Sequence, residues 1–267
     1  MALIYEKRGG IAYLTLNRPD VHNALDAETL VEMADAWVDY RDDPDLRCAI
    51  FTGAGDKTFC SGADLGKLTP IFTGARQPET KSEKQIVSDP TLIHRAGALD
   101  IGLFKPVIAA VNGRAIAGGM ELLFIADIRV ASEHATFGLP EVKRGVLPSG
   151  GSTAFLPRLI PRAAAVEMMM TGEPITAADA LRLGFANHVT PKGEEVSKAE
   201  EIAAKICKNG PLAVAGVKES VARSMAVSPE EALKIESEVA DRLFLTEDAR
   251  EGPRAFKEKR EPVFKGR

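Results

Sequence analysis

The sequence has little of what stabilises secreted or metal-dependent proteins. Its 267 residues include three cysteines and four histidines. Cys48, Cys60 and Cys207 are far apart, odd in number and form no Cys-x-x-Cys pair, which indicates reduced thiols in the cytosol. The histidines show no metal-ligand spacing, and no His-Glu-x-x-His motif occurs. We therefore expect a cytoplasmic protein without disulfides and without a metal site.

Long apolar runs and an excess of positive charge are also missing. No apolar stretch reaches the roughly 18 residues of a membrane helix, and the N-terminal segment lacks the pattern of a secretion signal. The 34 basic residues are outnumbered by 38 acidic residues, which gives a net charge of −4. This balance argues against binding of nucleic acid through a broad basic face. We expect no membrane and no nucleic acid as a partner.

The sequence lacks residues that common nucleotide-binding and nucleophile motifs require. The segment 113–119 has the glycine spacing of a P-loop, but Gly119 stands where the lysine is needed. No Gly-x-Gly-x-x-Gly follows a predicted strand. The segment 150–154 departs from the nucleophile-elbow pattern at its last residue. The glycines of these segments therefore give no support for a phosphate cradle or a nucleophile elbow.

The first two thirds of the chain alternate strand and helix patterns. Strands are predicted at 11–16, 47–52, 107–111 and 128–131, and the third is apolar on both faces, as a central strand is. One helix is predicted from apolar residues that recur with helical spacing: Leu30, Met33, Ala34, Trp37 and Val38. This alternation indicates an α/β fold with crossover connections.

Two stretches differ from this alternation. The polar segment 69–90 is predicted to be a mobile loop, either an inserted surface loop or a lid over a site. After about Glu194 the pattern is helical only, and the residues from Ser228 to Glu231 form a strong helix start. We expect this thin helical tail to pack on the body of the protein or on another subunit.

Two glycine-containing segments can bind a carbonyl group. The segment 59–65 (FCSGADL) follows a predicted strand, and the segment 117–123 (AGGMELL) opens a helical run after the central strand. Small residues let a ligand approach the backbone, and free N–H groups at a helix start carry partial positive charge. One N–H group from each segment, converging on a carbonyl oxygen, would make an oxyanion hole.

Glu121 and Glu141 are candidate acid–base residues beside such a carbonyl. Glu121 lies among apolar residues, where a carboxylate is costly to bury unless it is paired or functional. The alternatives are a surface position for Glu121 and a plain helix-start charge for Glu141, which follows Pro140. Two carboxyls can add water across an activated double bond, since one deprotonates the water and the other protonates the carbon next to the carbonyl.

The same segments closely resemble those of the enoyl-CoA hydratase/isomerase (crotonase) family. The resemblance rests on FCSGADL, PVIAAVNGRAIAGGMELLFIADIRVAS and ATFGLPEVKRGVLPSGG, and extends from LNRPDVHNAL to AFKEKREPVF. It implies an α/β fold of the crotonase type, a spiral of repeated ββα units with a C-terminal helical trimerisation region. It also implies CoA-thioester chemistry, with a catalytic core over 1–193 and an oligomerisation region over 194–267.

The resemblance assigns roles to residues of this sequence. It implies an oxyanion hole made by the backbone N–H groups of Ala63 and Gly118. Glu121 orients and activates water and Glu141 donates the α-proton, or the two share these tasks. Isomerases of the family typically keep one of the two glutamates, so the presence of both favours hydration or dehydration.

The resemblance also assigns the CoA contacts. They are Asn23, Ala24, Leu25, Ala63, Asp64, Leu65 and Gly66, with Phe256 and Lys259 reaching the CoA of a neighbouring subunit. A lysine near nucleotide phosphates is physically sensible, and the alternative is an ordinary helix with Phe256 packed and Lys259 solvated. A homotrimer or a dimer of trimers is implied. No metal or redox cofactor is implied, because CoA arrives as part of the substrate.

The leading hypothesis is an enoyl-CoA hydratase that converts a 2-enoyl-CoA into a 3-hydroxyacyl-CoA. Alternatives within the family are Δ3-Δ2 isomerisation, dehydration of a hydroxyacyl-CoA such as carnitinyl-CoA, and thioester hydrolysis. Alternatives from other classes are an RNA-binding role and a purely structural subunit. The substrate is left open by Ala117, Lys143-Arg144 and Ser149, which depart from the residues usual in the family. Ser149 either faces the acyl group or belongs to a turn.

Overall fold

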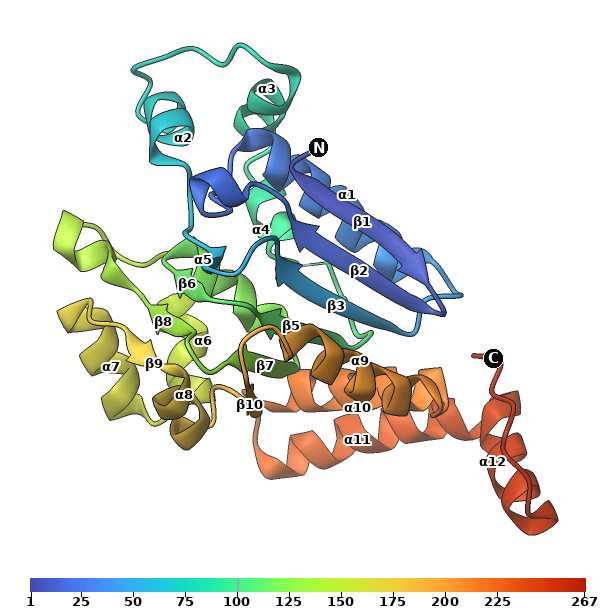
Figure 1. The fold of residues 1–267 in the computed structure, drawn as a ribbon. Coiled ribbons are helices and arrows are strands. Elements are labelled where there is room, and N and C mark those ends of the chain that lie inside the picture. Colours follow the sequence, from blue (N-terminus) through green and yellow to red (C-terminus); the bar gives the residue numbers. More distant parts are fainter. Residues whose placement is uncertain (100) are drawn as a thin grey trace.

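The structure is a computed structural model that describes residues 1–99 and 101–267, and its strands form two sheets (Figure 1). The larger sheet has the strand order β1-β2-β3-β5-β7-β10, and the smaller has the order β4-β6-β8-β9. The strands are β1 Leu3–Arg8, β2 Ile11–Leu16, β3 Cys48–Gly53, β4 Thr58–Cys60, β5 Val107–Val111, β6 Arg114–Ile116, β7 Ile128–Ser132, β8 Thr136–Gly138, β9 Ile175–Thr176 and β10 His188–Thr190.

Helices connect these strands and form the C-terminal end. The α-helices are α1 Ala27–Asp42, α2 Leu65–Phe72, α3 Lys81–Ser88, α4 Leu92–Ala96, α5 Gly118–Glu121, α6 Ser152–Leu159, α7 Arg162–Thr171, α8 Ala177–Leu183, α9 Glu195–Cys207, α10 Pro211–Ser224, α11 Pro229–Phe244 and α12 Glu247–Glu258. The 3-10 helices are η1 Pro19–Val21, η2 Leu122–Ile125 and η3 Pro140–Arg144.

The topology is a spiral of strand pairs. The strands β3, β5 and β7 of the larger sheet are each followed by a short strand, β4, β6 and β8, of the smaller sheet. Successive members of each series pair in parallel. Since parallel neighbours need crossover connections, each unit advances in the same direction along both sheets. This confirms the predicted α/β fold of repeated ββα units.

Helices cover both faces of the larger sheet and bury its central strand. On β5, Val107, Ala109 and Val111 join the main core, and Ile108 and Ala110 join a second core under α9. On the main side, α1 places Trp37 against Phe51 of β3, edge to face, with ring centroids 5.5 Å apart. The apolar pattern of 107–111 on both faces follows from this double burial.

The segment 69–90 is not the loop that its polarity predicted. The helix α2 continues to Phe72, and α3 begins after Thr80. Thr80 and Glu83 form a capping box, in which each side chain accepts a hydrogen bond from the other residue's backbone N–H at 3.1 Å. Ile71 and Ile86 anchor the two helices in the core. The prediction of a loop was wrong because helix caps and a few buried apolar side chains determine the structure of this segment. Its role as a lid stays a prediction.

The fully described segment 194–267 is helical and contains no strand, as predicted. The helix α11 begins where expected, with the Ser228 hydroxyl accepting a hydrogen bond from the Glu231 N–H at 3.3 Å. The helices α10 and α11 pack together, and α12 extends away from both sheets (Figure 1). The helix α9, by contrast, belongs to the core, so the functional boundary at 193/194 stays a prediction.

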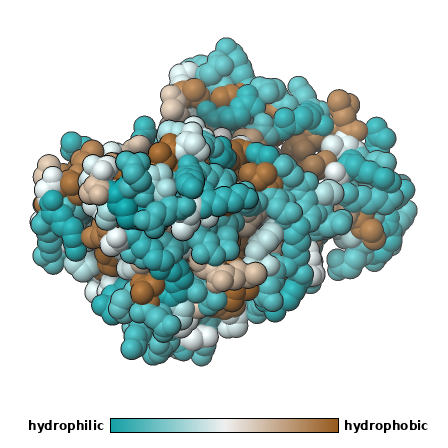
Figure 2. Space-filling model, turned by 90° about the horizontal axis from the view of Figure 1, so that it is seen from above, coloured by the Kyte–Doolittle hydropathy of each residue, from teal (hydrophilic) through white to brown (hydrophobic). Residues whose placement is uncertain are grey.

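The polar character of the surface agrees with the large share of polar and charged residues in the sequence. Figure 2 shows a face that is mainly hydrophilic, with separate hydrophobic groups between the polar residues. Within residues 1–99 and 101–267, no helix combines the length and the apolar character needed to cross a membrane.

Candidate active site

The two glycine segments meet beyond the ends of β4 and β6, which pair in parallel. A Cβ atom placed on Gly62 would lie 2.9 Å from the amide nitrogen of Gly118, and one placed on Gly118 would lie 3.7 Å from the amide nitrogen of Ala63. Gly62 also has a φ of +86°, which favours glycine. The structure therefore brings Ala63 and Gly118 side by side, as the resemblance implied.

The N–H groups of Ala63 and Gly118 are available to a ligand. In the described part of the chain, neither group donates a hydrogen bond to the protein. Gly118 is the first residue of α5, where an N–H group has no acceptor within the helix. Ala63 is exposed to solvent. Two adjacent free N–H groups are the donors that an oxyanion hole requires.

The backbone of Ala63 is held in place by the segment after η1. Leu25 and Ala63 form an isolated parallel bridge, with hydrogen bonds of 2.8 Å from Leu25 N–H to Gly62 and from Asp64 N–H to Leu25. The guanidinium of Arg18 binds the Ala24 carbonyl and the Asp64 carboxylate, the latter at 3.1 Å. The predicted CoA-contact segments 23–25 and 63–66 are thus neighbours in space.

Asn23 has a structural role in this arrangement. Its side-chain amide donates to the carbonyls of Ala54 and Thr58 at 3.0 and 2.8 Å and accepts from the N–H of Arg18 at 2.9 Å. Asn23 is buried. Its contact with CoA stays a prediction, whereas Leu65 at the start of α2 is 59% exposed and accessible to a ligand.

Glu121 lies at the end of α5 with one carboxylate oxygen fully engaged. Its Oε1 accepts hydrogen bonds from the Gly150 N–H at 2.6 Å and from the Ser152 hydroxyl at 2.7 Å. Both donors stand at the start of α6. A Cβ on Gly150 would lie 2.2 Å from Oε2 of Glu121, so any side chain there would displace the carboxylate.

Glu141, in η3, has the opposite environment. Its Oε2 is buried and has no hydrogen-bond partner in residues 1–99 and 101–267. Burial raises the pKa of the Glu141 carboxyl above its ordinary value, and the nearby charge of Glu121 raises it further. A buried polar atom without a partner is rare and points to a ligand or a water molecule. Two neighbouring carboxyls in such different environments suit separate acid and base roles.

Phe256 and Lys259 do not reach this site in their own chain. Both are exposed, and the helix α12 that carries Phe256 lies at the other end of the molecule from α5 (Figure 1). Phe256 is 87% exposed, so the alternative in which it packs in its own chain is wrong. Contact with the CoA of a neighbouring subunit stays a prediction.

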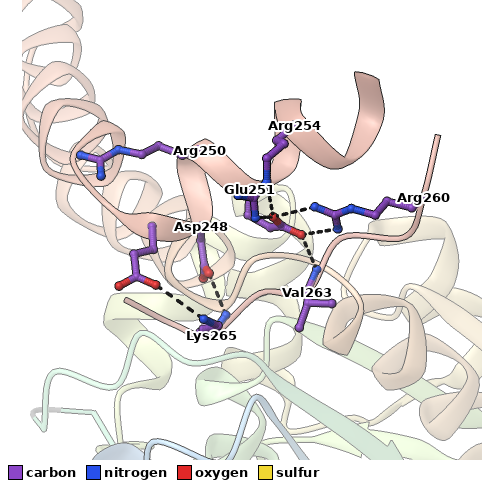
Figure 3. Close-up of a pocket in the computed structure, with 8 residues that line it drawn as sticks. Asp248, Arg250, Glu251, Arg254, Arg260, Val263 and Lys265 are labelled. Carbon is purple, nitrogen blue, oxygen red and sulfur yellow. Dashed lines mark hydrogen bonds and ion pairs between the residues drawn. The ribbon is translucent and has the colours of Figure 1, made fainter. Parts of the chain in front are cut away.

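A pocket of about 430 Å³ beside α12 is structural (Figure 3). Glu251 accepts hydrogen bonds from Arg260 at 2.6 Å and from the Val263 N–H at 3.0 Å. Asp248 accepts from the backbone N–H of Lys265 at 2.7 Å. These charged groups fasten the C-terminal segment to α12 and are hydrogen-bonded within the chain, unlike the free N–H groups and the unpartnered Glu141 oxygen near α5.

The sequence did not identify three residues that shape the candidate site, namely Arg18, Gly150 and Ser152. Arg18 is visible in the sequence only as part of a turn signal before Pro19. Gly150 and Ser152 lie in the segment 150–154, considered above only as a nucleophile elbow, and they meet a glutamate 29 and 31 positions earlier in the chain. No local pattern encodes a contact of this range.

Comparisons with known proteins agree with this arrangement. A sequence profile described as enoyl-CoA hydratase/isomerase matches residues 6–267. The enoyl-CoA hydratase EchA19 of Mycobacterium tuberculosis is 44% identical over 99% of this chain and 96% of its own. A carnitinyl-CoA dehydratase of Salmonella paratyphi A is 42% identical over 98% of this chain and 97% of its own. The crystal structure of an enoyl-CoA hydratase from Bacillus anthracis matches with a TM-score of 0.89 and 34% identity, covering 100% of both chains.

The raised pKa of Glu141 predicts a pH-dependent cost to stability. Between the ordinary carboxyl pKa, about 4.3, and the raised value, the folded state binds more protons than the unfolded state, so stability falls as pH rises. Glu141→Gln cannot ionise and escapes this loss. We expect its Tm, relative to the wild type, to rise with pH from about pH 4 up to the raised pKa of Glu141 and to level off above it. Thermal unfolding of both proteins across this pH range checks the prediction, and a pH-independent difference in Tm between Glu141→Gln and the wild type contradicts it.

Proposed function

Because the chain belongs to the enoyl-CoA hydratase/isomerase family and has the crotonase fold, we propose that it is an enoyl-CoA hydratase. It adds water across the 2,3 double bond of a 2-enoyl-CoA and forms a 3-hydroxyacyl-CoA. The observation that carries the proposal is the pair Glu121 and Glu141, one hydrogen-bonded and one buried without a partner. Hydration needs both a base for water and an acid for carbon.

The reaction begins at the backbone donors. The N–H groups of Ala63 and Gly118 bind the thioester oxygen and polarise the conjugated double bond. The free oxygen of Glu121, Oε2, accepts a proton from water while the water oxygen bonds to C3, and the π electrons move to the thioester oxygen as an enolate. The enolate then takes the Glu141 proton at C2. Transfer of a proton from Glu121 to Glu141 restores the starting state.

Apolar residues beside the two glutamates support an acyl substrate. Val146 and Leu147, which lie between Glu141 and Gly150 in the chain, are 56% and 64% exposed. Exposed apolar side chains next to polar reacting groups are typical of a site for a partly apolar ligand. We propose that they contact the acyl chain and that CoA, which lies along 23–25 and 63–66, enters only as part of the substrate.

Dehydration of a hydroxyacyl-CoA is the reverse of this reaction and uses the same groups. The name of the relative called carnitinyl-CoA dehydratase is therefore compatible with the proposed reaction type. The acyl group is left open, and the exposed Ser149 stands near the glutamates as a polar candidate contact.

We also propose that the chain self-associates through its C-terminal helices. The C-terminal apolar surface comprises Val217 and Val221 of α10, Leu233 and Phe244 of α11, and Leu245, all of them exposed. These residues lie on or next to two helices that pack together, and large contiguous apolar patches on a protein surface are typical of interaction sites. A second copy of the chain supplies an equivalent apolar surface, in keeping with the trimer or dimer of trimers that the family resemblance implies.

The proposed roles predict severe losses when either glutamate is neutralised. We expect Glu121→Gln and Glu141→Gln each to lower kcat for crotonyl-CoA hydration by about 10² to 10⁴, because each loses a proton transfer. The control Glu133→Gln replaces an exposed glutamate and should keep wild-type activity. Loss of absorbance of the conjugated thioester and the mass of the product give the rates. Near-normal hydration in both glutamate variants would refute the assignment.

The C-terminal apolar surface predicts the oligomeric state. Light scattering after size-exclusion chromatography should give the mass of a trimer or hexamer for the wild type. Val221→Lys places a charge in the interface and should shift the protein to the mass of one chain. The control Val87→Lys changes a similarly exposed valine on α3 and should leave the mass unchanged. A monomeric wild type, or an unaltered oligomer in Val221→Lys, contradicts this interface.

A further inference from the structure

We propose that Ser152 is a positioning residue for Glu121, which fixes one carboxylate oxygen so that the other faces the reacting water. The inference rests on the proposed hydration and adds a residue whose side chain touches neither substrate nor water.

The contacts of Ser152 place it behind Glu121. Ser152 is 0% exposed and is the first residue of α6. Its hydroxyl donates to Oε1 of Glu121 at 2.7 Å, the same oxygen that the Gly150 N–H contacts at 2.6 Å. In the described residues, no donor approaches Oε2 within hydrogen-bonding distance. The two oxygens of one carboxylate are therefore in unequal surroundings.

This inequality matters because a carboxylate rotates readily about its terminal bond, and the rotation has nearly two-fold symmetry. A single donor would hold one oxygen by one bond and leave the plane of the group free to turn. Two donors at different positions, a backbone N–H and a side-chain hydroxyl, fix the plane as well. The Oε2 atom then keeps one direction, as a base that must accept a proton from a particular water molecule requires.

The hydroxyl of Ser152 has no other structural task. The capping position of α6 is occupied by Gly151, which has no side chain, so Ser152 does not cap the helix. Glu121 is its hydrogen-bond partner within residues 1–99 and 101–267. Since the site of the hydroxyl is closed to solvent, removing it leaves a gap of atomic size in which water is poorly held. Removal of the Ser152 hydroxyl should therefore affect mainly the orientation of the Glu121 carboxylate.

The test compares Ser152→Ala with a matched control. Ser132 is also 0% exposed, and its hydroxyl hydrogen-bonds His134 at 2.8 Å, away from α5 and α6. Ser132→Ala thus loses an equally buried hydroxyl of similar geometry. Ser152→Thr keeps a hydroxyl and serves as the rescue variant. Ser152→Cys, which nearly conserves volume and donates only weakly, replaces Ser152→Ala if the latter does not fold.

We expect Ser152→Ala to lower kcat by about 10- to 100-fold, the effect of losing one hydrogen bond to a charged group. KM should stay within about twofold, because Ser152 is buried behind Glu121 and away from the bound substrate. Ser152→Thr should restore most of kcat, and Ser132→Ala should match the wild type.

The outcomes separate this proposal from the hydratase assignment. If the wild type hydrates 2-enoyl-CoAs and Ser152→Ala keeps its kcat, Ser152 does not position Glu121 and the hydratase proposal stands. If the wild type hydrates none of them, the hydratase proposal fails, and the ¹³C NMR signal of the labelled Glu121 carboxyl at one fixed pH decides the role of Ser152. A signal in Ser152→Ala identical to that of the wild type overturns the proposal, and a displaced one supports it.

Discussion

The close approach of two backbones beside α5 is the constraint on which the candidate site depends. Gly62 lies against Gly118, and a Cβ on the next residue, Gly119, would lie 2.1 Å from the Cys60 carbonyl oxygen. Only glycines allow β4 and α5 to pack this closely. The packing places the free N–H groups of Ala63 and Gly118 together, and it sets the start of the short helix that carries Glu121. The proposed base Glu121 and the proposed oxyanion donors are therefore positioned by the same backbone contact.

The two glutamates that we propose as base and acid have unlike surroundings, although their side chains are chemically the same. Glu121 receives two donors from the start of α6, whereas Glu141 keeps a buried oxygen without a partner in the described residues. Burial raises the pKa of the Glu141 carboxyl. The stability of the folded state therefore falls as pH rises above the ordinary carboxyl pKa. Sites that perform chemistry often hold such groups at some expense in stability, and the surrounding core supplies the compensation.

Much of this arrangement is readable from the sequence where signals are local. The strands at 11–16 and 107–111, the buried face of α1 and the start of α11 follow from periodicity and caps. The strands β4, β6 and β8 have three residues each, too few for an alternating pattern of apolar residues to be recognised. The segment that contains the capping box at Thr80 is polar, and a polar composition favours the prediction of a loop. The partners of Glu121 could not be predicted, because Ser152 meets it only after the chain has passed through both sheets.

The central claim is that this site joins water to a conjugated thioester. The most direct measurement is mass spectrometry of crotonyl-CoA and longer 2-enoyl-CoAs after incubation with the wild-type protein in water enriched in ¹⁸O. The account predicts a product heavier by one labelled water, with the thioester intact and the label on C3. Release of free CoA with label in the carboxylate, an isomer of unchanged mass, or no labelled adduct with any 2-enoyl-CoA would contradict it.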